Sequence, residues 1–308
     1  MRIAILGATS QIAKDLVLSF SAQGDHQLVL YARRPEVVSQ WLASAGLSGR
    51  YVVADFAAFS ADEHFDAILN FVGAGNPAQA AAMGASIFDV TLKYDEMALN
   101  YVRQHPQCRY IFLSSGAAYG SSFDEPVDEN TKAVIAINNL QPQDWYGVAK
   151  LHAECRHRAL AHLPIVDIRV FNYFSHTQDM SARFLITDIL RAIDSRKILV
   201  VSAENVVRDY IGPTDFYILV TLILYAPGCN DVVNCYTREP VAKMTLLTTM
   251  KERFGLIYKV TEDASGVNAT GIKKNYYPMN QNLRRYGYMP TRTSLETVLY
   301  ETSKVLNV

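Results

Sequence analysis

The sequence is poor in cysteine and has no C-x-x-C pair. Its 308 residues include only Cys108, Cys155, Cys229 and Cys235, and none of these has a histidine nearby at the spacing of a zinc site. We therefore expect buried free thiols and no metal site. Unpaired cysteines are also typical of a reducing, cytoplasmic compartment.

An excess of charge of one sign is also missing, since 29 basic and 30 acidic residues give a formal net charge of -1. This balance provides no long-range field for nucleic acid or an anionic membrane, so we expect neither as a partner. The most apolar internal stretch, Phe216 to Ala226, is shorter than the roughly 20 residues that span a bilayer. The first residues lack the apolar core and cleavage site of a secretory signal.

Short apolar runs alternate with segments of helical periodicity. The runs are Arg2–Leu6, Gln27–Leu30, Tyr51–Ala54, Ala67–Phe71 and Arg109–Leu113, with Ile165–Val170 and Lys197–Val201 as further candidates. Between the first two runs, Ile12–Ala22 has the periodicity of a helix. This alternation predicts an α/β fold in which a doubly wound parallel sheet is covered by helices on both faces.

The second half of the chain is less regular, and no linker separates it from the first. Leu246–Phe254 and Ser294–Val305 have helical patterns, whereas Gly228–Cys235 and Thr261–Tyr277 have the patterns of strands and loops. We expect residues 1–170 to form a nucleotide-binding domain, to which residues 197–225 partly return. Residues 171–308 would form mainly a smaller C-terminal α/β lobe that binds substrate and is interleaved with the first domain.

The segment from Gly7 to Ala13 follows the first predicted strand and opens the first predicted helix. In Rossmann-type folds, glycines here let the backbone approach a dinucleotide pyrophosphate, to which the helix N-terminus offers free N–H groups. Only Gly7 is a glycine here, and Ser10 and Ala13 stand where two more are expected, so an ordinary turn is the alternative. The residues expected to contact the cofactor in this turn are Gly7, Thr9, Ser10, Gln11 and Ile12.

Two arginines, Arg33 and Arg34, follow the second predicted strand, where NAD-binding proteins usually carry an acidic residue. Guanidinium groups suit the 2′-phosphate of NADP(H), which we therefore favour, with NAD(H) as the alternative cofactor. A solvated basic loop is the competing interpretation. Further expected cofactor contacts follow the third and fourth strands, namely Asp55, Phe56, Phe71, Val72 and Gly73.

Tyr146 and Lys150 are four residues apart, so they share one face of a predicted helix. A nearby ammonium lowers the pKa of a phenol, which can then exchange a proton with a substrate oxygen while a nicotinamide exchanges hydride. The spacing alone also fits an exposed helix pair. Ser114 and Ser115 end the fifth predicted strand, at the sheet edge where the active crevice of such folds lies, so either can orient the reacting oxygen.

Several motifs in this order resemble the extended short-chain dehydrogenase/reductases, in the branch of NAD(P)-dependent sugar-nucleotide epimerases, dehydratases and reductases. Besides the N-terminal turn, they are S-S-G-A-A-Y-G at 114–120, Y-G-V-A-K at 146–150, R-V-F-N-Y-F at 169–174, R-D-Y-I at 208–211 and L-R-R-Y-G-Y-M-P-T-R-T-S-L-E at 283–296. The resemblance covers nearly the whole chain and implies an enzyme that acts on a nucleotide-diphosphate sugar.

The resemblance also implies roles for single residues. Tyr146 would be the general acid/base, and Lys150 would lower its pKa and bind the nicotinamide ribose. Ser115 would contact the sugar oxygen, with Ser114 as the fallback. Asn172 would bind the substrate near its diphosphate.

Arg208 would neutralise that diphosphate, unless it serves instead as an ion pair with Asp209. The family commonly dimerises through the helix that carries the Tyr/Lys pair, so the resemblance also implies a homodimer.

Two chemistries of this family fit the sequence. The acidic pair of the 4,6-dehydratases is replaced by Ala117-Ala118, which argues against dehydration. A 4-ketoreductase that uses NADPH is favoured by Arg33 and Arg34, and an NAD-dependent 4-epimerase is the alternative. A reductase of non-sugar carbonyls and a regulator that senses NADP without turnover are weaker hypotheses.

Overall fold

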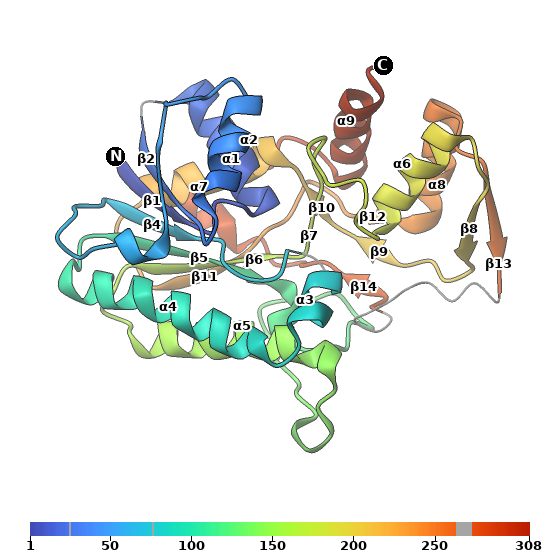
Figure 1. Ribbon diagram of the computed structural model, residues 1–308. Coiled ribbons are helices and arrows are strands. Elements are labelled where there is room, and N and C mark those ends of the chain that lie inside the picture. Colours follow the sequence, from blue (N-terminus) through green and yellow to red (C-terminus); the bar gives the residue numbers. More distant parts are fainter. Residues whose placement is uncertain (25, 76, 263–272) are drawn as a thin grey trace.

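The computed structural model describes residues 1–24, 26–75, 77–262 and 273–308 (Figure 1). Residues 263–272, within the segment predicted as strand and loop at Thr261–Tyr277, lie outside the described residues. The main feature is a parallel sheet of seven strands in the order β11-β6-β5-β4-β1-β2-β3. Its strands are β1 (Arg2–Leu6), β2 (Gln27–Tyr31), β3 (Val52–Ala54), β4 (Ala67–Asn70), β5 (Arg109–Ser115), β6 (Ile165–Val170) and β11 (Asp231–Asn234).

Helices cover both faces of this sheet, which confirms the predicted doubly wound α/β fold. One face packs against α1 (Gln11–Gln23), α2 (Pro35–Ser44) and α7 (Pro213–Tyr225), and the other packs against α4 (Ser86–Gln104) and α5 (Pro142–Ala159). Because both faces are covered, apolar side chains alternate between two cores: Ile3 and Ile5 face one, and Ala4 and Leu6 face the other. The strand order reverses between β1 and β4, where open α/β sheets bind ligands.

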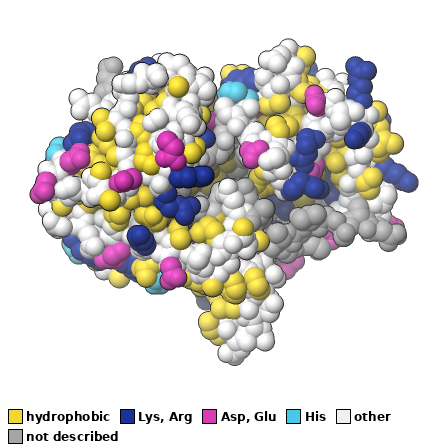
Figure 2. All heavy atoms as spheres, viewed as in Figure 1, with side chains coloured by type: hydrophobic (Ala, Val, Ile, Leu, Met, Phe, Trp, Pro, Cys, Tyr) yellow, Lys and Arg dark blue, Asp and Glu magenta, His cyan; other side chains and the backbone are white. Residues whose placement is uncertain are grey.

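A smaller lobe has its own apolar core and three small sheets. Its helices are α6 (Leu185–Ser195), α8 (Lys243–Phe254) and α9 (Ser294–Leu306), and α3 (Pro77–Met83) is a short helix beside α5. Its sheets pair β7 (Asn172–Tyr173) with β10 (Tyr210–Ile211), β9 (Val207–Arg208) with β12 (Val241–Ala242) and β14 (Asn275–Tyr276), and β8 (Leu199–Ser202) with β13 (Tyr258–Thr261). Figure 2 shows Lys and Arg side chains on both sides of the boundary between the two lobes.

Only part of residues 197–225 returns to the large sheet. The strand expected at Lys197–Val201 forms at Leu199–Ser202, but it pairs with β13 in the small lobe. The segments that return are α7, which packs on α1, and β11, which extends the large sheet beyond β6. The physical reason is burial: the α7 residues Phe216, Leu219 and Val220 belong to the core beneath the sheet.

All four cysteines are free thiols. Cys108 and Cys235 are buried as expected, whereas Cys155 is exposed on α5 and Cys229 is half-buried. Within the described ranges, none of the helices combines the length and apolarity needed to cross a bilayer.

Candidate active site

The predicted site residues gather at the carboxyl edge of the large sheet. Because its strands are parallel and in register, the segments after β1, β2, β4 and β5 all emerge at that edge. Leu6 pairs with both Tyr31 and Asn70, so Gly7 follows β1 at the level where Phe71 follows β4. The same edge receives Ser115 at the end of β5.

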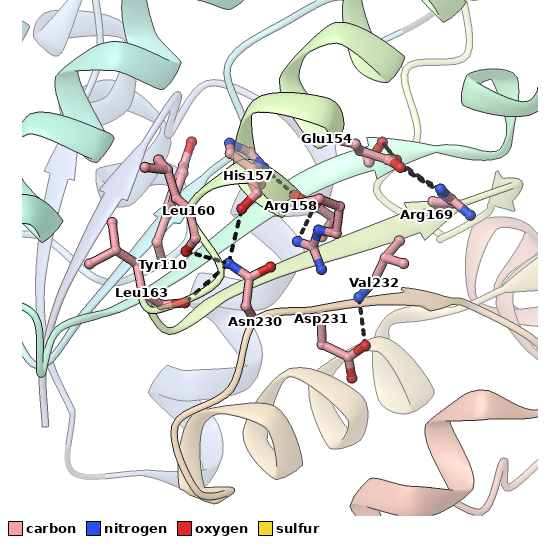
Figure 3. Close-up of polar contacts among 12 residues, drawn as sticks. Tyr110, Glu154, His157, Arg158, Leu160, Leu163, Arg169, Asn230, Asp231 and Val232 are labelled. Carbon is pink, nitrogen blue, oxygen red and sulfur yellow. Dashed lines mark hydrogen bonds and ion pairs between the residues drawn. The ribbon is translucent and has the colours of Figure 1, made fainter.

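Helix α5 brings Tyr146 and Lys150 to this edge. Pro142 is its first residue, and the Asp144 carboxylate accepts a hydrogen bond of 3.0 Å from the backbone N–H of Gln141, so the helix begins at a defined place. Its other end is held by Asn230, whose amide donates to the carbonyls of His157, Leu160 and Leu163 at 3.0 to 3.1 Å (Figure 3).

Gly147 fixes the distance between α5 and the end of β5. A Cβ at this position would lie 2.5 Å from the carbonyl oxygen of Ala117, in the short 3₁₀ helix η2 (Gly116–Tyr119) that follows β5. Only glycine allows this approach. Tyr146, the neighbouring residue, is thereby held beside Ser115.

The ammonium of Lys150 is buried beside the Tyr146 ring. Its Nζ donates a hydrogen bond of 2.7 Å to the carbonyl oxygen of Leu113 and lies 5.8 Å from the centre of the Tyr146 ring. Burial lowers the pKa of Lys150 to about 8, although the carboxylates of Asp95, Glu154 and Asp167 favour its charged form. At neutral pH the group is therefore mostly protonated.

Tyr146 differs from the expectation in one respect. Burial raises the pKa of its phenol above the ordinary value, and a hydrogen bond with Ser115 lowers it only in part. The Lys150 ammonium donates to the carbonyl of Leu113 in this structure, so it is not directed at the Tyr146 phenol. The phenol is therefore a proton donor here.

The two serines at the end of β5 have different surroundings. Ser114 donates a hydrogen bond of 2.5 Å to Glu154, which in turn forms an ion pair with Arg169 (Figure 3). The Ser115 hydroxyl lies 3.3 Å from the phenol oxygen of Tyr276 and accepts from the backbone N–H of Ala117 at 3.2 Å. Ser115 is thus the serine that contacts Tyr146 and Tyr276, whereas Ser114, the alternative candidate, pairs with Glu154.

Behind the site, α4, α5 and the sheet enclose a buried charged cluster. The imidazole of His157 lies between Asp95 and Asp167, at 2.7 Å and 2.6 Å from their carboxylate oxygens. Arg156 pairs with Asp95, and Arg158 pairs with Asp167. Although burial opposes the charge, the two carboxylates raise the pKa of His157 to about 9. The cluster therefore fixes the helix that carries Tyr146 and Lys150.

The backbone of the turn after β1 has a conformation that suits a dinucleotide pyrophosphate. Gly7 has a φ of +82°, and a Cβ there would lie 2.8 Å from the backbone nitrogen of Val72. Ala13 is fully buried under the turn, where a small residue is required, and Ser10 makes no capping hydrogen bond with its side chain. Gly73 has a φ of +149°, and a Cβ there would lie 3.5 Å from Lys150 Nζ, in van der Waals contact. This backbone lets a cofactor approach between the first turn and Lys150.

Other predicted cofactor residues have other partners. The Gln11 amide hydrogen-bonds Thr177 and lies 3.3 Å from a carboxylate oxygen of Asp15, so it links the first helix to the small lobe. Asp55 accepts from the backbone N–H groups of Ala57 and Ala58 and so caps a 3₁₀ helix, while Phe56 packs on Tyr94. Ile12 packs on the core, Phe71 is buried within it, and Thr9 is exposed.

Arg33 and Arg34 follow β2 and are exposed. Among the described residues their guanidinium groups form no hydrogen bond or ion pair. They are thus free to meet an anion beside the carboxyl end of β2.

The two predicted substrate residues lie on small-lobe strands next to Tyr276. The Asn172 amide donates to the carbonyl oxygen of Asp209 at 3.3 Å, and Arg208 Nη1 donates to that of Val207 at 2.8 Å. Arg208 forms no ion pair with Asp209, because the Asp209 carboxylate accepts from Thr237 and Ser294 instead. Burial lowers the pKa of Arg208. Its guanidinium has no acidic partner within the described part of the chain, as suits a phosphate-binding group.

The family follows from the sequence as a whole. The model of the NAD dependent epimerase/dehydratase family matches residues 3–235. The chain belongs to this family. Membership confirms the resemblance to the extended short-chain dehydrogenase/reductases and the expectation of an enzyme of that type. No curated protein matches the sequence.

Solved structures share the family fold over the whole chain at low identity. UDP-glucuronic acid 4-epimerase from Bacillus cereus matches with a TM-score of 0.79 at 16% identity, covering 100% of this chain and 99% of that one. UDP-glucose-4-epimerase from Stenotrophomonas maltophila has a TM-score of 0.79 at 18% identity, covering 100% and 98%. dTDP-glucose 4,6-dehydratase from Bacillus anthracis has a TM-score of 0.75 at 15% identity, covering 100% and 96%. These likenesses show the fold.

Two residues beside the candidate site, Tyr276 and Lys273, were not identified from the sequence. Tyr276 reaches Ser115 across 161 positions of sequence, and Lys273 lines a pocket beside Tyr146 that also includes Ala117, Ser121 and Asp144. Neither residue belongs to a local motif, so only the tertiary fold reveals them.

Proposed function

We propose that this enzyme oxidises and reduces C4 of a nucleotide-linked sugar with a nicotinamide cofactor, and that the complete reaction is a 4-epimerisation. The observation that carries the proposal is the convergence of Ser115, Tyr146 and Lys150 at the carboxyl edge of the sheet. Structural relatives named as 4-epimerases support epimerisation better than the keto reduction that the sequence favoured. Ala117 and Ala118, in place of acidic residues, argue against dehydration.

A nicotinamide cofactor, held by the turn after β1 and by Lys150, would supply the hydride chemistry, and the residues of the site would act on the proton. Tyr146 would exchange a proton with the C4 oxygen, accepting it when the C4 carbinol is oxidised and returning it when the 4-keto sugar is reduced. Acceptance requires the phenolate form, whereas the arrangement in this structure favours the neutral phenol. Ser115 would hydrogen-bond the same oxygen, and the Lys150 ammonium would stabilise the phenolate once it turns from the Leu113 carbonyl toward Tyr146. When the 4-keto sugar is reduced on its opposite face, Tyr146 would return the proton to the C4 oxygen, which gives the epimer.

The small lobe supplies the groups that would hold the rest of the substrate. Arg208 would bind the diphosphate, because its half-buried guanidinium lacks a carboxylate among the described residues. Asn172 would bind near the same phosphates from the adjacent strand. A substrate without a diphosphate would leave this cation unpaired, which argues against a non-sugar carbonyl.

A 4-ketoreductase that consumes NADPH is the second candidate. Arg33 and Arg34 favour it, because free guanidinium groups at the end of β2 suit a 2′-phosphate. An epimerase recycles its cofactor within one turnover, whereas a reductase must exchange it.

Cofactor extraction distinguishes the two candidates. Tightly retained NAD(H) in the purified protein, together with interconversion of a UDP-sugar and its C4 epimer, is the expected result. A protein that binds added NADPH and oxidises it with a 4-keto sugar would establish the reductase instead. Tyr146→Phe, which leaves the packing intact, should reduce turnover roughly a hundredfold or more. Wild-type turnover in that variant would contradict the mechanism, and a regulator that only senses NADP would show no turnover in either form.

We also propose a homodimer through α4 and α5, which lie side by side on one face of the sheet (Figure 1). Sedimentation equilibrium tests this assembly, and a monomer at micromolar concentration would contradict it.

Four free thiols are in keeping with a cytoplasmic location, which we propose for the enzyme.

A further inference from the structure

Lys273 is a buried cation beside the catalytic tyrosine. Its side chain is 9% exposed, and its Nζ lies 4.5 Å from the centre of the Tyr276 ring and 5.1 Å from that of Phe123. It forms no hydrogen bond or ion pair with any described residue. Burial, aided by the charge of Arg208, lowers its pKa to about 8, and Asp144 partly opposes this shift.

Such an ammonium is costly to bury without an anion. Two aromatic faces offset part of the lost hydration, but they replace neither the hydrogen bonds nor the counter-charge. The surrounding apolar cluster includes Phe123, Val127 and Tyr276, and it strengthens any electrostatic contact made there. Lys273 is therefore prepared for an anionic group that arrives with a ligand.

The anion that meets Lys273 can be a group on the sugar or the diphosphate. The lining of the pocket favours a group on the sugar. Lys273 lines the pocket that contains Tyr146 and Ser121, whereas Arg208 does not line it. A group that meets Lys273 there lies on the side of Tyr146, which is where the proposed reaction places the sugar ring.

We propose that Lys273 binds a carboxylate on the sugar ring, so that the preferred substrate is a nucleotide-linked uronic acid. This inference rests on the proposed function, because it assumes that the sugar occupies the pocket at Tyr146. It makes Lys273 a specificity-determining residue, distinct from the Ser115, Tyr146 and Lys150 group.

Paired substrates test the inference. The probes are UDP-glucuronic acid and UDP-glucose, with the wild type, Lys273→Met, Lys273→Arg and the control Lys274→Met, whose residue is exposed next along the chain. In Lys273→Met we expect kcat/KM for UDP-glucuronic acid to fall roughly tenfold to a hundredfold. The value for UDP-glucose should stay nearly unchanged, Lys273→Arg should retain part of the preference, and Lys274→Met should match the wild type.

Three outcomes would overturn it. An equal loss for both substrates would assign Lys273 to the diphosphate. No loss for either would leave Lys273 without a role in binding. A wild type that fails to prefer the acidic sugar, or does not bind it, would also contradict the proposal. A thermal melt of each variant separates these outcomes from misfolding.

Proton uptake provides a readout independent of turnover. A bound carboxylate should raise the pKa of Lys273, so binding of UDP-glucuronic acid at pH 8 should take up part of a proton in the wild type and none in Lys273→Met. Calorimetry in two buffers of different ionisation enthalpy measures this uptake, and UDP-glucose is the control ligand. In Tyr146→Phe the uptake should persist while turnover is lost. If turnover also persists, the proposed function fails and the role of Lys273 stands.

Discussion

The hydroxyl of Ser115 lies 3.3 Å from the phenol oxygen of Tyr276. Burial raises the pKa of Tyr276, so this phenol remains neutral and is able to donate. In the proposed reaction a sugar oxygen must hydrogen-bond the same serine, so substrate and Tyr276 compete for it.

Tyr276→Phe tests this competition while preserving the ring beside Lys273. Because a hydrogen bond of this kind is worth about 1 kcal/mol, we expect KM to fall roughly fivefold with kcat unchanged. Steady-state kinetics measure both values. A fall in kcat at constant KM would show instead that Tyr276 positions the serine.

Substitution of each of the two adjacent serines should change either kcat or the unfolding free energy, but not both. Ser115→Ala removes a hydrogen bond to the reacting oxygen, so kcat should fall roughly a hundredfold with little change in the unfolding free energy. Ser114→Ala is the matched control. It deprives buried Glu154 of a donor, so it should cost about 1 to 3 kcal/mol of stability and leave kcat nearly unchanged. If Ser114→Ala instead lowers kcat and Ser115→Ala instead lowers the unfolding free energy in urea, then Ser114 is the serine that contacts the reacting oxygen and Ser115 is the structural one.

His157 should make stability depend on pH near neutrality. Its folded pKa is about 9, above the ordinary value of 6.5, so its contribution is complete below pH 6.5 and is lost as pH rises toward 9. The lowered pKa values of Lys150 and Lys273, both about 8, have the opposite effect at higher pH, so the informative window is pH 6.5 to 8.

We expect the wild type to lose about 1 to 2 kcal/mol of unfolding free energy across that window, and His157→Gln to lose much less. Urea unfolding at several pH values measures this slope. His152→Gln, an exposed substitution on the same helix, should keep the wild-type slope. An identical slope in His157→Gln would mean that the cluster does not titrate in this range.

Arg33 and Arg34 should govern the choice of cofactor. If they bind a 2′-phosphate, replacing both with alanine should weaken NADPH binding roughly tenfold or more and leave NADH binding nearly unchanged. Fluorescence titration with each cofactor measures both affinities, and NADH is the internal control. If the wild type binds NADH and NADPH equally well, the two arginines belong to a solvated loop and do not bind the 2′-phosphate.

The sequence predicted most of the large sheet, and it singled out Tyr146 and Lys150, because both depend on local patterns. Apolar runs marked β1, β2, β4, β5 and β6, and the helical spacing of Tyr146 and Lys150 required no knowledge of other elements. It could not decide between Ser114 and Ser115. Successive strand residues point to opposite faces, and which face meets α5 depends on how the helix packs.

The sequence did not predict the contacts between residues far apart in the chain. Lys273 and Tyr276 reach the site only because β14 pairs with β9, and nothing in the local pattern indicates that pairing. The pairing of β8 with β13 was hidden for the same reason. Gln11 was expected to contact a cofactor because of its place in the first turn, but its amide bonds Thr177 of the small lobe.

The close contact between Gly147 and Ala117 separates two properties that can change independently. The spacing of Tyr146 and Ser115 is set by that backbone approach, whereas much of the pocket wall comes from residues 134–144 and Lys273. If the sugar occupies this pocket as proposed, substitutions in the wall can alter which sugar is accepted without moving Tyr146 or Ser115. For an engineer, the wall is the part to randomise, and Gly147 is the part to leave alone.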